Sequence, residues 1–207
     1  MRAIRKITLP PCCIFMPKCR YLHHLIQTFG MEKIGIFCSA SDSIDRIYFE
    51  KTAELGEWMG KEGKTLVYGG SNMGLMECIA QAVKQNGGTI IGVVPAKLEE
   101  AGRASNLLDK TIRTIGLSDR KDTMVALSDI LVALPGGIGT MDEIFHTLAE
   151  ASLGYHAKKV ILYNINGFYD SLREMLEIFR QRHFIKCPLE HRLLATRDFE
   201  ELKHLLQ

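Results

Sequence analysis

Short runs of apolar residues recur along the chain from residue 33 onward, and longer amphipathic stretches separate them. The runs are rich in Val, Ile and Leu at consecutive positions, which is typical of strands buried on both faces of a parallel sheet. They cover residues 33–38, 65–70, 89–95, 111–115, 129–135 and 159–164. The pattern therefore predicts that these six runs form one mostly parallel sheet.

The amphipathic stretches predict helices, because their apolar residues recur at helical spacing. Ser43 is a candidate N-cap for the first helix, and Gly87 and Gly88 form a stop signal for the second. The predicted helices lie within residues 43–63, 73–88, 140–154, 168–184 and 198–207. Because strands and helices alternate, we expect residues 31–207 to form a single α/β domain. Its fold is predicted to be a doubly wound, Rossmann-like sheet with helices on both faces.

Composition and charge exclude several classes of protein. Hydrophobic residues make up 46% of the 207 residues and charged residues 24%, as in a soluble globular protein with a core. No apolar run reaches the roughly 18 residues that a membrane span needs. The first thirty residues carry five of the 26 basic residues and none of the 24 acidic ones, so the rest has a net charge of −3. This mildly acidic body argues against nucleic-acid binding.

The first thirty residues differ from the rest, because they have no clear hydrophobic period. Prolines at positions 10, 11 and 17 interrupt any apolar segment of a signal peptide. A metal cluster is not favoured by the irregular spacing of Cys12, Cys13, Cys19, His23 and His24. We expect residues 1–30 to be an extension, either disordered or the product of a start codon assigned upstream of Met31. The other cysteines are scattered, which indicates reduced thiols in a cytoplasmic protein.

Two strand-end loops contain candidate binding residues, because ligands of doubly wound sheets bind at the carboxyl ends of the strands. The loop "FCSAS" offers the hydroxyl of Ser39, although alone it is also typical of a polar turn. The loop "YGGSNMGLM" contains Gly69 and Gly70 before a predicted helix, whose N-terminal N–H groups suit a phosphate. This spacing is not that of a dinucleotide fingerprint, and a P-loop lysine is missing.

A third strand-end loop, "PGGIGTMDEIF", has the strongest signal. Gly136, Gly137 and Gly139 free the backbone, and Thr140 offers a hydroxyl at a helix start, so the loop suits an anion. The acidic pair that follows is expected in the first turn of this helix, where acidic residues also favour the helix dipole. Alone, the pair would be explained by the dipole.

A basic pair, Arg120–Lys121, lies in a loop or helix start after the run 111–115. Such a pair is often only solvated. Here it is followed by a predicted strand, the glycine loop and Glu143. In a doubly wound sheet, elements in this order converge at one edge.

Taken together, these residues resemble the LOG (Lonely Guy) family, whose members are often labelled lysine decarboxylase-like. The family has an Arg-Lys pair sixteen residues before the first glycine of P-G-G-x-G-T-x-x-E, and Arg120 precedes Gly136 by that interval. "LVYGGSNMGLM" resembles Y-G-G-x-x-x-G-L-M, "FCSAS" lies where the family has a Ser/Gly-rich loop, and "NINGFYDSL" resembles N-x-x-G-[FY]-[FY]-x-x-L. The residues offer no support for a pyridoxal-phosphate site.

The resemblance implies a phosphoribohydrolase, which cleaves the N-glycosidic bond of a nucleoside 5′-monophosphate into free base and ribose 5-phosphate. It implies an N6-modified adenosine monophosphate or AMP as substrate, no cofactor, no metal, and a homodimer. The amphipathic helices 43–61 and 139–153 are candidates for the dimer surface; the alternative is that they only cover the sheet. Arg120 and Glu143 match the catalytic positions. The matching nucleotide-binding positions are Lys121, Gly136, Gly137, Ile138, Gly139, Thr140, Met141 and Asp142.

The implied chemistry agrees with the residue types. Departure of the base builds positive charge on the ribose, as in glycoside hydrolysis. The carboxylate of Glu143 can stabilise that charge, orient a water as general base, or both. Residues 136–140 can bind the 5′-phosphate and fix the sugar beside it. Arg120 can hold a ribose hydroxyl, hold a phosphate oxygen, or assist departure of the base.

Several positions depart from the family pattern. Leu117 and Ser118 replace a usual Met-His, and Glu77 replaces a glycine. Ala149 and Glu150 lie where many members have Thr-Trp. These changes affect base preference more than reaction type, so a purine or pyrimidine nucleosidase of other preference stays open. A carrier of a nucleotide or of molybdenum cofactor also stays open, although a pure binder does not need both Arg120 and Glu143.

Overall fold

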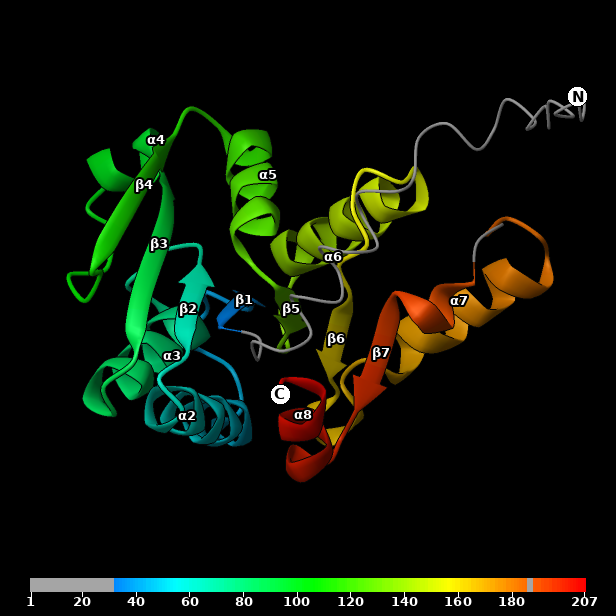
Figure 1. Ribbon diagram of the computed structural model, residues 1–207, viewed down its shortest axis with the longest axis horizontal. Helices are drawn as coiled ribbons and strands as arrows, with labels where there is room; N and C mark the ends of the chain where they lie inside the picture. Colours follow the sequence, from blue (N-terminus) through cyan, green and yellow to red (C-terminus); the bar gives the residue numbers. More distant parts are fainter. Residues whose placement is uncertain (1–31, 186–187) are drawn as a thin grey trace, which may run out of the picture. The chain divides into compact units, whose positions relative to one another are not determined.

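The computed structural model describes residues 32–185 and 188–207. The predicted extension over residues 1–30, with its cysteines and histidines, lies outside the described residues. The described residues form one compact unit, built around a seven-stranded sheet with the order β4-β3-β2-β1-β5-β6-β7 (Figure 1). Every neighbouring pair of strands is parallel. The predicted α/β fold is therefore confirmed.

The strands are β1 (Lys33–Phe37), β2 (Thr65–Tyr68), β3 (Thr89–Pro95), β4 (Lys110–Thr114), β5 (Ile130–Ala133), β6 (Val160–Tyr163) and β7 (Leu193–Thr196). The α-helices are α2 (Arg46–Lys61), α3 (Gly74–Gln85), α4 (Ala96–Glu100), α5 (Leu117–Leu127), α6 (Ile138–Ser152), α7 (Asp170–Gln181) and α8 (Phe199–Leu205). Two 3₁₀ turns are η2 (Ile165–Gly167) and η3 (Leu189–His191). None of the described helices is long and apolar enough to cross a membrane.

Helices cover both faces of the sheet, as predicted. One apolar cluster joins the sheet to α2, α3 and α8, for example through Leu55, Ile79 and Leu202. The other cluster joins the opposite face to α5 and α6 through Met124 and Ile144. The alternating side chains of the strands divide between these clusters, since successive residues of a strand point to opposite faces.

Several elements differ from the predictions. Residues Leu117–Leu127 form helix α5, where only a loop or helix start was expected, because these residues show no clear apolar period. Strand β7 was not predicted, because only four residues pair with β6 at the edge of the sheet. Helix α4 was also missed, and its five residues are too few for a helical period. The predicted N-cap Ser43 is wrong, because α2 begins after Asp45. The N–H of Ser43 instead donates to the hydroxyl of Ser41, which keeps these residues in the loop.

The order of the strands creates a switch point beside β1. From β1 the chain adds strands on one side through β4 and then returns to the other side of β1 with β5. The pairing continues past the strands, since Leu134 N–H donates to the Phe37 carbonyl and Ser39 N–H donates to the Pro135 carbonyl. Ligands of open α/β sheets bind where the strand order reverses, so this edge is the candidate site.

A buried tyrosine ties the last part of the chain to this edge. The hydroxyl of Tyr169 donates to the Leu134 carbonyl at 2.6 Å, and the side chain amide of buried Asn164 accepts from the Tyr169 N–H at 2.7 Å. The match to "NINGFYDSL" therefore marks residues that support the loop after β5.

We expect Tyr169→Phe to lower the free energy of unfolding by about 1–3 kcal/mol, because the buried Leu134 carbonyl loses its donor. Urea unfolding followed by circular dichroism measures this loss. Tyr155→Phe is the control, since Tyr155 is 77% exposed and its loss of a hydroxyl should change stability by less than about 0.5 kcal/mol. Equal effects of the two substitutions would contradict the assigned role of Tyr169.

Candidate functional site

The structure brings together the three loops that the sequence singled out. The loop after β1 lies beside the loop after β5, where Ser39 N–H bonds to Pro135. The start of α3 docks on the same loop, because the Leu75 N–H donates to the Ser39 carbonyl at 2.9 Å. Gly69, at the end of β2, lies directly against the side chain of Arg120. The predicted convergence at one sheet edge is therefore present.

Arg120 and Glu143 form a buried ion pair at this edge. Arg120 extends from α5 and Glu143 from α6, and their Nη1 and Oε1 atoms are 3.2 Å apart. The two residues are only 8% and 4% exposed. The Arg120 Nε–H also donates to the carbonyl of Val93 in β3 at 3.3 Å. The two residues predicted to be catalytic are thus in direct contact.

Gly69 makes room for this arginine. A Cβ at position 69 would lie 1.5 Å from Nη2 of Arg120, so any side chain there would displace the guanidinium. Gly70 has a φ of +70°, and a Cβ on it would lie 2.4 Å from Val94. These close approaches disfavour a side chain at either of the two glycines predicted to bind substrate.

Burial governs the ionisation of Glu143. It raises the pKa of this carboxyl to about 7, against the opposing effect of the Arg120 charge, and Asp142 raises it further. Two groups behind the pair were not predicted. Cys38 is 2% exposed and Tyr169 is fully buried, and burial is the first cause that raises the pKa of both, with the charge of Glu143 adding to it. Cys38 could have been noticed, since it directly precedes Ser39 in the strand-end loop.

The glycine loop forms an uncapped helix end. Helix α6 begins at Ile138 with Gly137 as N-cap, and no side chain caps it. Gly136 admits the buried hydroxyl of Thr140, because a Cβ there would lie 2.0 Å from Thr140 Oγ1. Gly137 and Gly139 face open space, with no atom within 4 Å of an added Cβ. The first N–H groups of this helix are therefore available to an anion.

The predicted first-turn position of the acidic pair is wrong. Because α6 begins at Ile138, Asp142 and Glu143 lie in its second turn. Both carboxylate oxygens of Asp142 lie 2.8 Å from Nζ of Lys121, whose side chain is 13% exposed. The helix dipole acts mainly within the first turn, so it does not explain this pair. Lys121 and Asp142 instead form a second contact between α5 and α6.

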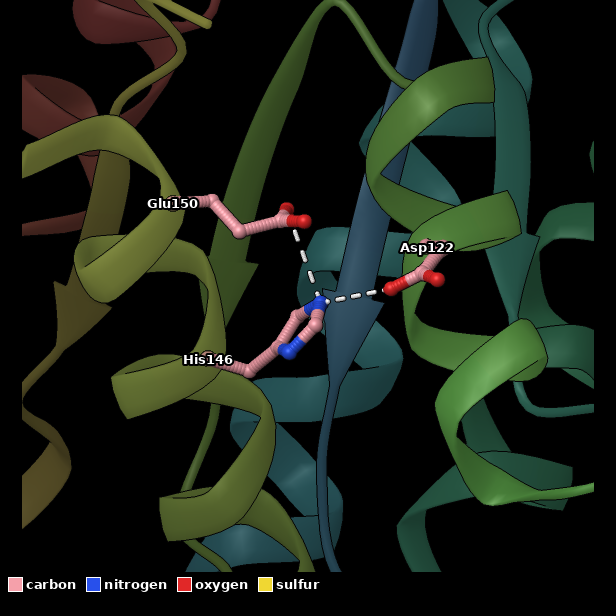
Figure 2. A group of neighbouring side chains, drawn as sticks. All are labelled: Asp122, His146 and Glu150. Atoms are coloured by element: carbon pink, nitrogen blue, oxygen red, sulfur yellow. Dashed lines mark ion pairs between the residues drawn. The ribbon is translucent and has the colours of Figure 1, made fainter. Parts of the chain in front are cut away.

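Other predicted residues lie at the rim of this edge. Ile138 is 90% exposed at the start of α6, and Met141 packs partly buried against the cluster beneath it. Within the described ranges, the side chains that could hold a metal ion lie beside the site rather than in it, on Asp122, His146 and Glu150 (Figure 2).

A glycine loop at the switch point of a doubly wound sheet, with a buried acid beside it, is typical of an α/β domain that binds a nucleotide. A family model described as "Possible lysine decarboxylase" matches residues 76–206. The chain is 35% identical over 176 residues to "Probable cytokinin riboside 5'-monophosphate phosphoribohydrolase LOGL9" of Oryza sativa subsp. japonica. The matched residues make up 85% of this chain and 78% of that protein. The chain belongs to this family, the LOG family.

Further comparisons agree on family and fold. Cytokinin riboside 5'-monophosphate phosphoribohydrolase LOG5 of Arabidopsis thaliana is 31% identical, over 85% of this chain and 77% of its own length. The molybdenum cofactor carrier protein of Chlamydomonas reinhardtii has a similar fold, with a TM-score of 0.64 at 24% identity, over 85% of this chain and 98% of that one. The molybdenum cofactor binding protein of Rippkaea orientalis also has a similar fold, with a TM-score of 0.63 at 23% identity. The match covers 86% of this chain and 99% of that one.

The raised pKa of Glu143 makes stability depend on pH. The folded carboxyl ionises at about 7 and the unfolded one near its ordinary 4.5. The stabilising contribution of the neutral form is complete below 4.5 and is lost as the pH rises through 7. Glu143→Gln stays neutral, so its free energy of unfolding relative to the wild type should rise by up to about 3 kcal/mol between pH 4.5 and 8. Urea unfolding at a series of pH values tests this, and a constant difference would contradict it.

Proposed function

We propose that the protein hydrolyses the N-glycosidic bond of a nucleoside 5′-monophosphate, with an N6-modified adenosine monophosphate of the cytokinin type as substrate. The products are the free base and ribose 5-phosphate. The observation that carries the proposal is the buried Arg120–Glu143 pair beside the uncapped start of α6. The names of the relatives support the same reaction.

In this mechanism Glu143 acts on the sugar. As the base departs, positive charge develops at the anomeric carbon, and a carboxylate in a buried site stabilises such charge more than water does. A pKa of about 7 also leaves the carboxylate basic enough to take a proton from an attacking water. Water adds its oxygen to the anomeric carbon, and the base leaves with the bonding electrons and a proton.

The start of α6 binds the 5′-phosphate in this proposal. Its uncapped N–H groups and the Thr140 hydroxyl favour an anion, and Glu143 lies one turn further along the same helix. Binding the phosphate there fixes the distance between ribose and carboxylate, which contributes to the rate. Arg120 holds the carboxylate in place, and its guanidinium can also contact a substrate oxygen.

Release of free base tests this proposal. The substrates are AMP, N6-isopentenyl-AMP, GMP, CMP and UMP, each beside its nucleoside without phosphate. We expect release from monophosphates only, with a preference for the N6-modified one, and a loss of at least about 100-fold in kcat for Glu143→Gln. Glu200→Gln is the control and keeps full activity, since Glu200 is 75% exposed on α8.

Each other outcome has a defined meaning. A preference for a different base would retain the hydrolase and replace the substrate. Nucleotide binding without release of any base would contradict the enzyme and favour the carrier that the sequence left open. Full activity of Glu143→Gln would contradict the assigned role of this carboxylate.

We further propose a homodimer formed through α6. Exposed apolar side chains follow one face of this helix: Ile138 at 90%, Phe145 at 38% and Leu153 at 76%. Helix α2, the other predicted surface, presents no exposed large apolar side chain. Sedimentation should therefore give about twice the chain mass of 23.3 kDa. Leu153→Asp should weaken the dimer while Phe184→Asp, at a residue 78% exposed elsewhere, does not; a monomeric wild type would contradict the proposal.

A further inference from the structure

A cluster of potential metal ligands lies beside the proposed reaction site. Asp122 extends from α5, and His146 and Glu150 extend from α6 (Figure 2). One ligand atom of each lies within 4.8 Å of the others. We propose that these three side chains bind a divalent transition-metal cation, for which Zn²⁺ is the natural probe. The cation takes no part in the hydrolysis; it joins the two helices that carry Arg120 and Glu143.

The distances suit a shared cation. Nε2 of His146 is 2.9 Å from Oδ1 of Asp122 and 3.5 Å from Oε2 of Glu150. Two ligand atoms that are each about 2.0–2.1 Å from a tetrahedral zinc ion lie roughly 3.3 Å apart. The observed separations lie on either side of this value. One imidazole and two carboxylates also form a donor set that zinc accepts.

The imidazole nitrogen has no hydrogen-bond partner of its own. Nε2 of His146 is shielded from solvent, yet neither carboxylate meets it in hydrogen-bond geometry. Figure 2 shows this nitrogen between the two carboxylates. If Nε2 carries a proton, this single donor cannot bond to both carboxylates. If Nε2 is unprotonated, its lone pair faces two anions, which is unfavourable. A cation between the three groups satisfies all of them.

His156 lies beside Glu150 but is not one of the three proposed ligands. Its Nε2 lies 3.6 Å from Oε2 of Glu150 and makes no hydrogen bond, whereas its Nδ1 accepts the Lys158 N–H at 3.2 Å. With Nδ1 as an acceptor, the neutral ring carries its proton on Nε2, so this nitrogen has no lone pair to offer a metal ion.

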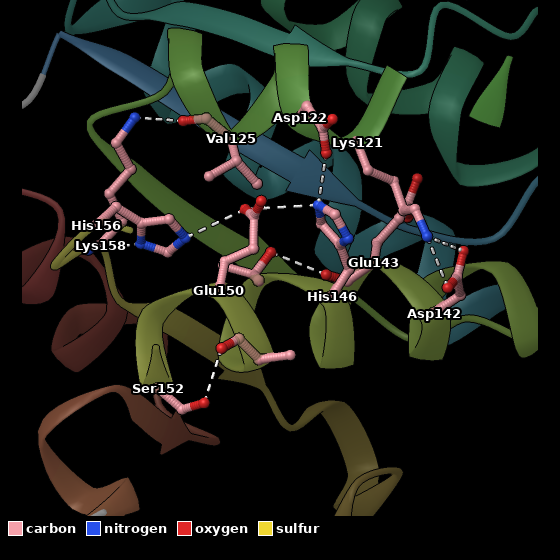
Figure 3. A network of polar contacts seen from close by, with 12 residues as sticks. Lys121, Asp122, Val125, Asp142, Glu143, His146, Glu150, Ser152, His156 and Lys158 are labelled. Atoms are coloured by element: carbon pink, nitrogen blue, oxygen red, sulfur yellow. Dashed lines mark hydrogen bonds and ion pairs between the residues drawn. The ribbon is translucent and has the colours of Figure 1, made fainter. Parts of the chain in front are cut away.

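The neighbouring lysines are engaged elsewhere. Lys121 contacts Asp142, and Nζ of Lys158 contacts the carbonyls of Val125 and Ala126 at the end of α5 (Figure 3). Among the described residues, Asp122 and Glu150 have ion-pair contacts only with histidines. Two carboxylates therefore share a region without a lysine or arginine partner, and a divalent cation balances their charge.

The cluster lies close to the proposed reactive pair along both helices. His146 and Glu150 are four residues apart, which places them on one face of α6, and Asp122 meets them from α5. Asp122 is two residues from Arg120, and His146 is three residues from Glu143. A cation here would fix the two helices at the next turn beyond the reactive pair.

Calorimetric titration of the full chain with ZnCl₂ tests the proposal. Zinc that binds elsewhere on the chain contributes equally to wild type and variant, so the decisive quantity is the difference between them. We expect His146→Asn and Glu150→Gln each to remove one equivalent, or to weaken it by at least about 10–100-fold. Zinc at 100 times its Kd should raise the melting temperature of the wild type by roughly 5–10 °C, and that of the variants by less.

His191→Asn is the matched control, because His191 lies in η3 and outside the cluster. It should keep the full zinc stoichiometry. Circular dichroism without zinc establishes that each variant is folded, and two different ligand substitutions guard against one that is not. Equal zinc binding by the wild type, His146→Asn and Glu150→Gln would overturn the proposal and leave the cluster as a set of ion-pair contacts without a metal ion. The result is independent of base release, so it stands or fails apart from the proposed hydrolase.

Discussion

The contact between Arg120 and Glu143 is the interaction on which the site depends. Removing each of the two charges from water costs several kcal/mol of free energy. Their mutual attraction offsets this cost only when the geometry of the pair is good. The surrounding chain supports the pair in two ways: the Val93 carbonyl accepts a hydrogen bond from Arg120, and Gly69 has no side chain that would displace the guanidinium. Such an arrangement does not maximise stability. Perturbed and buried ion pairs in a cleft are more typical of sites that perform chemistry.

The pattern of apolar residues predicted six strands, because strands buried on both faces leave a continuous signal. It predicted most of the covering helices but gave α5 only as a loop or helix start, because the first part of this helix is polar. The apolar pattern also did not predict two short elements, because they contain too few residues to show a period. Strand β7 has four residues at the sheet edge, and α4 has five. The start of α6 was placed too late, because glycines in a helix start resemble those of a loop. That difference moved Glu143 from the first turn, where the dipole would explain it, to the second.

The order of motifs along the chain was enough to predict that Arg120 and Glu143 meet, since topology brings the ends of parallel strands together. It was not enough to predict what surrounds them. Cys38 and Tyr169 are buried near enough to Glu143 for its charge to raise their pKa values, and this proximity comes from tertiary packing that leaves no local pattern. The glycine at position 69 was expected to approach a phosphate, and the structure shows in addition that it makes room for the guanidinium of Arg120. This second constraint on the glycine depends on a residue 51 positions away, so the local motif could not indicate it.

The pairing of β1 with β5 has a consequence for the order in which the molecule forms. The carboxylate of Asp129 binds the N–H groups of Glu32 and Lys33, which are 97 and 96 residues away along the chain. During synthesis at about 5–20 residues per second, β1 waits roughly 5–20 s for this neighbour. Until then one edge of β1 stays open, and closing so long a loop is slow. The site therefore cannot form before β5 and the start of α6 have been made, and a nascent chain that ends before β5 has part of the sheet and lacks Glu143.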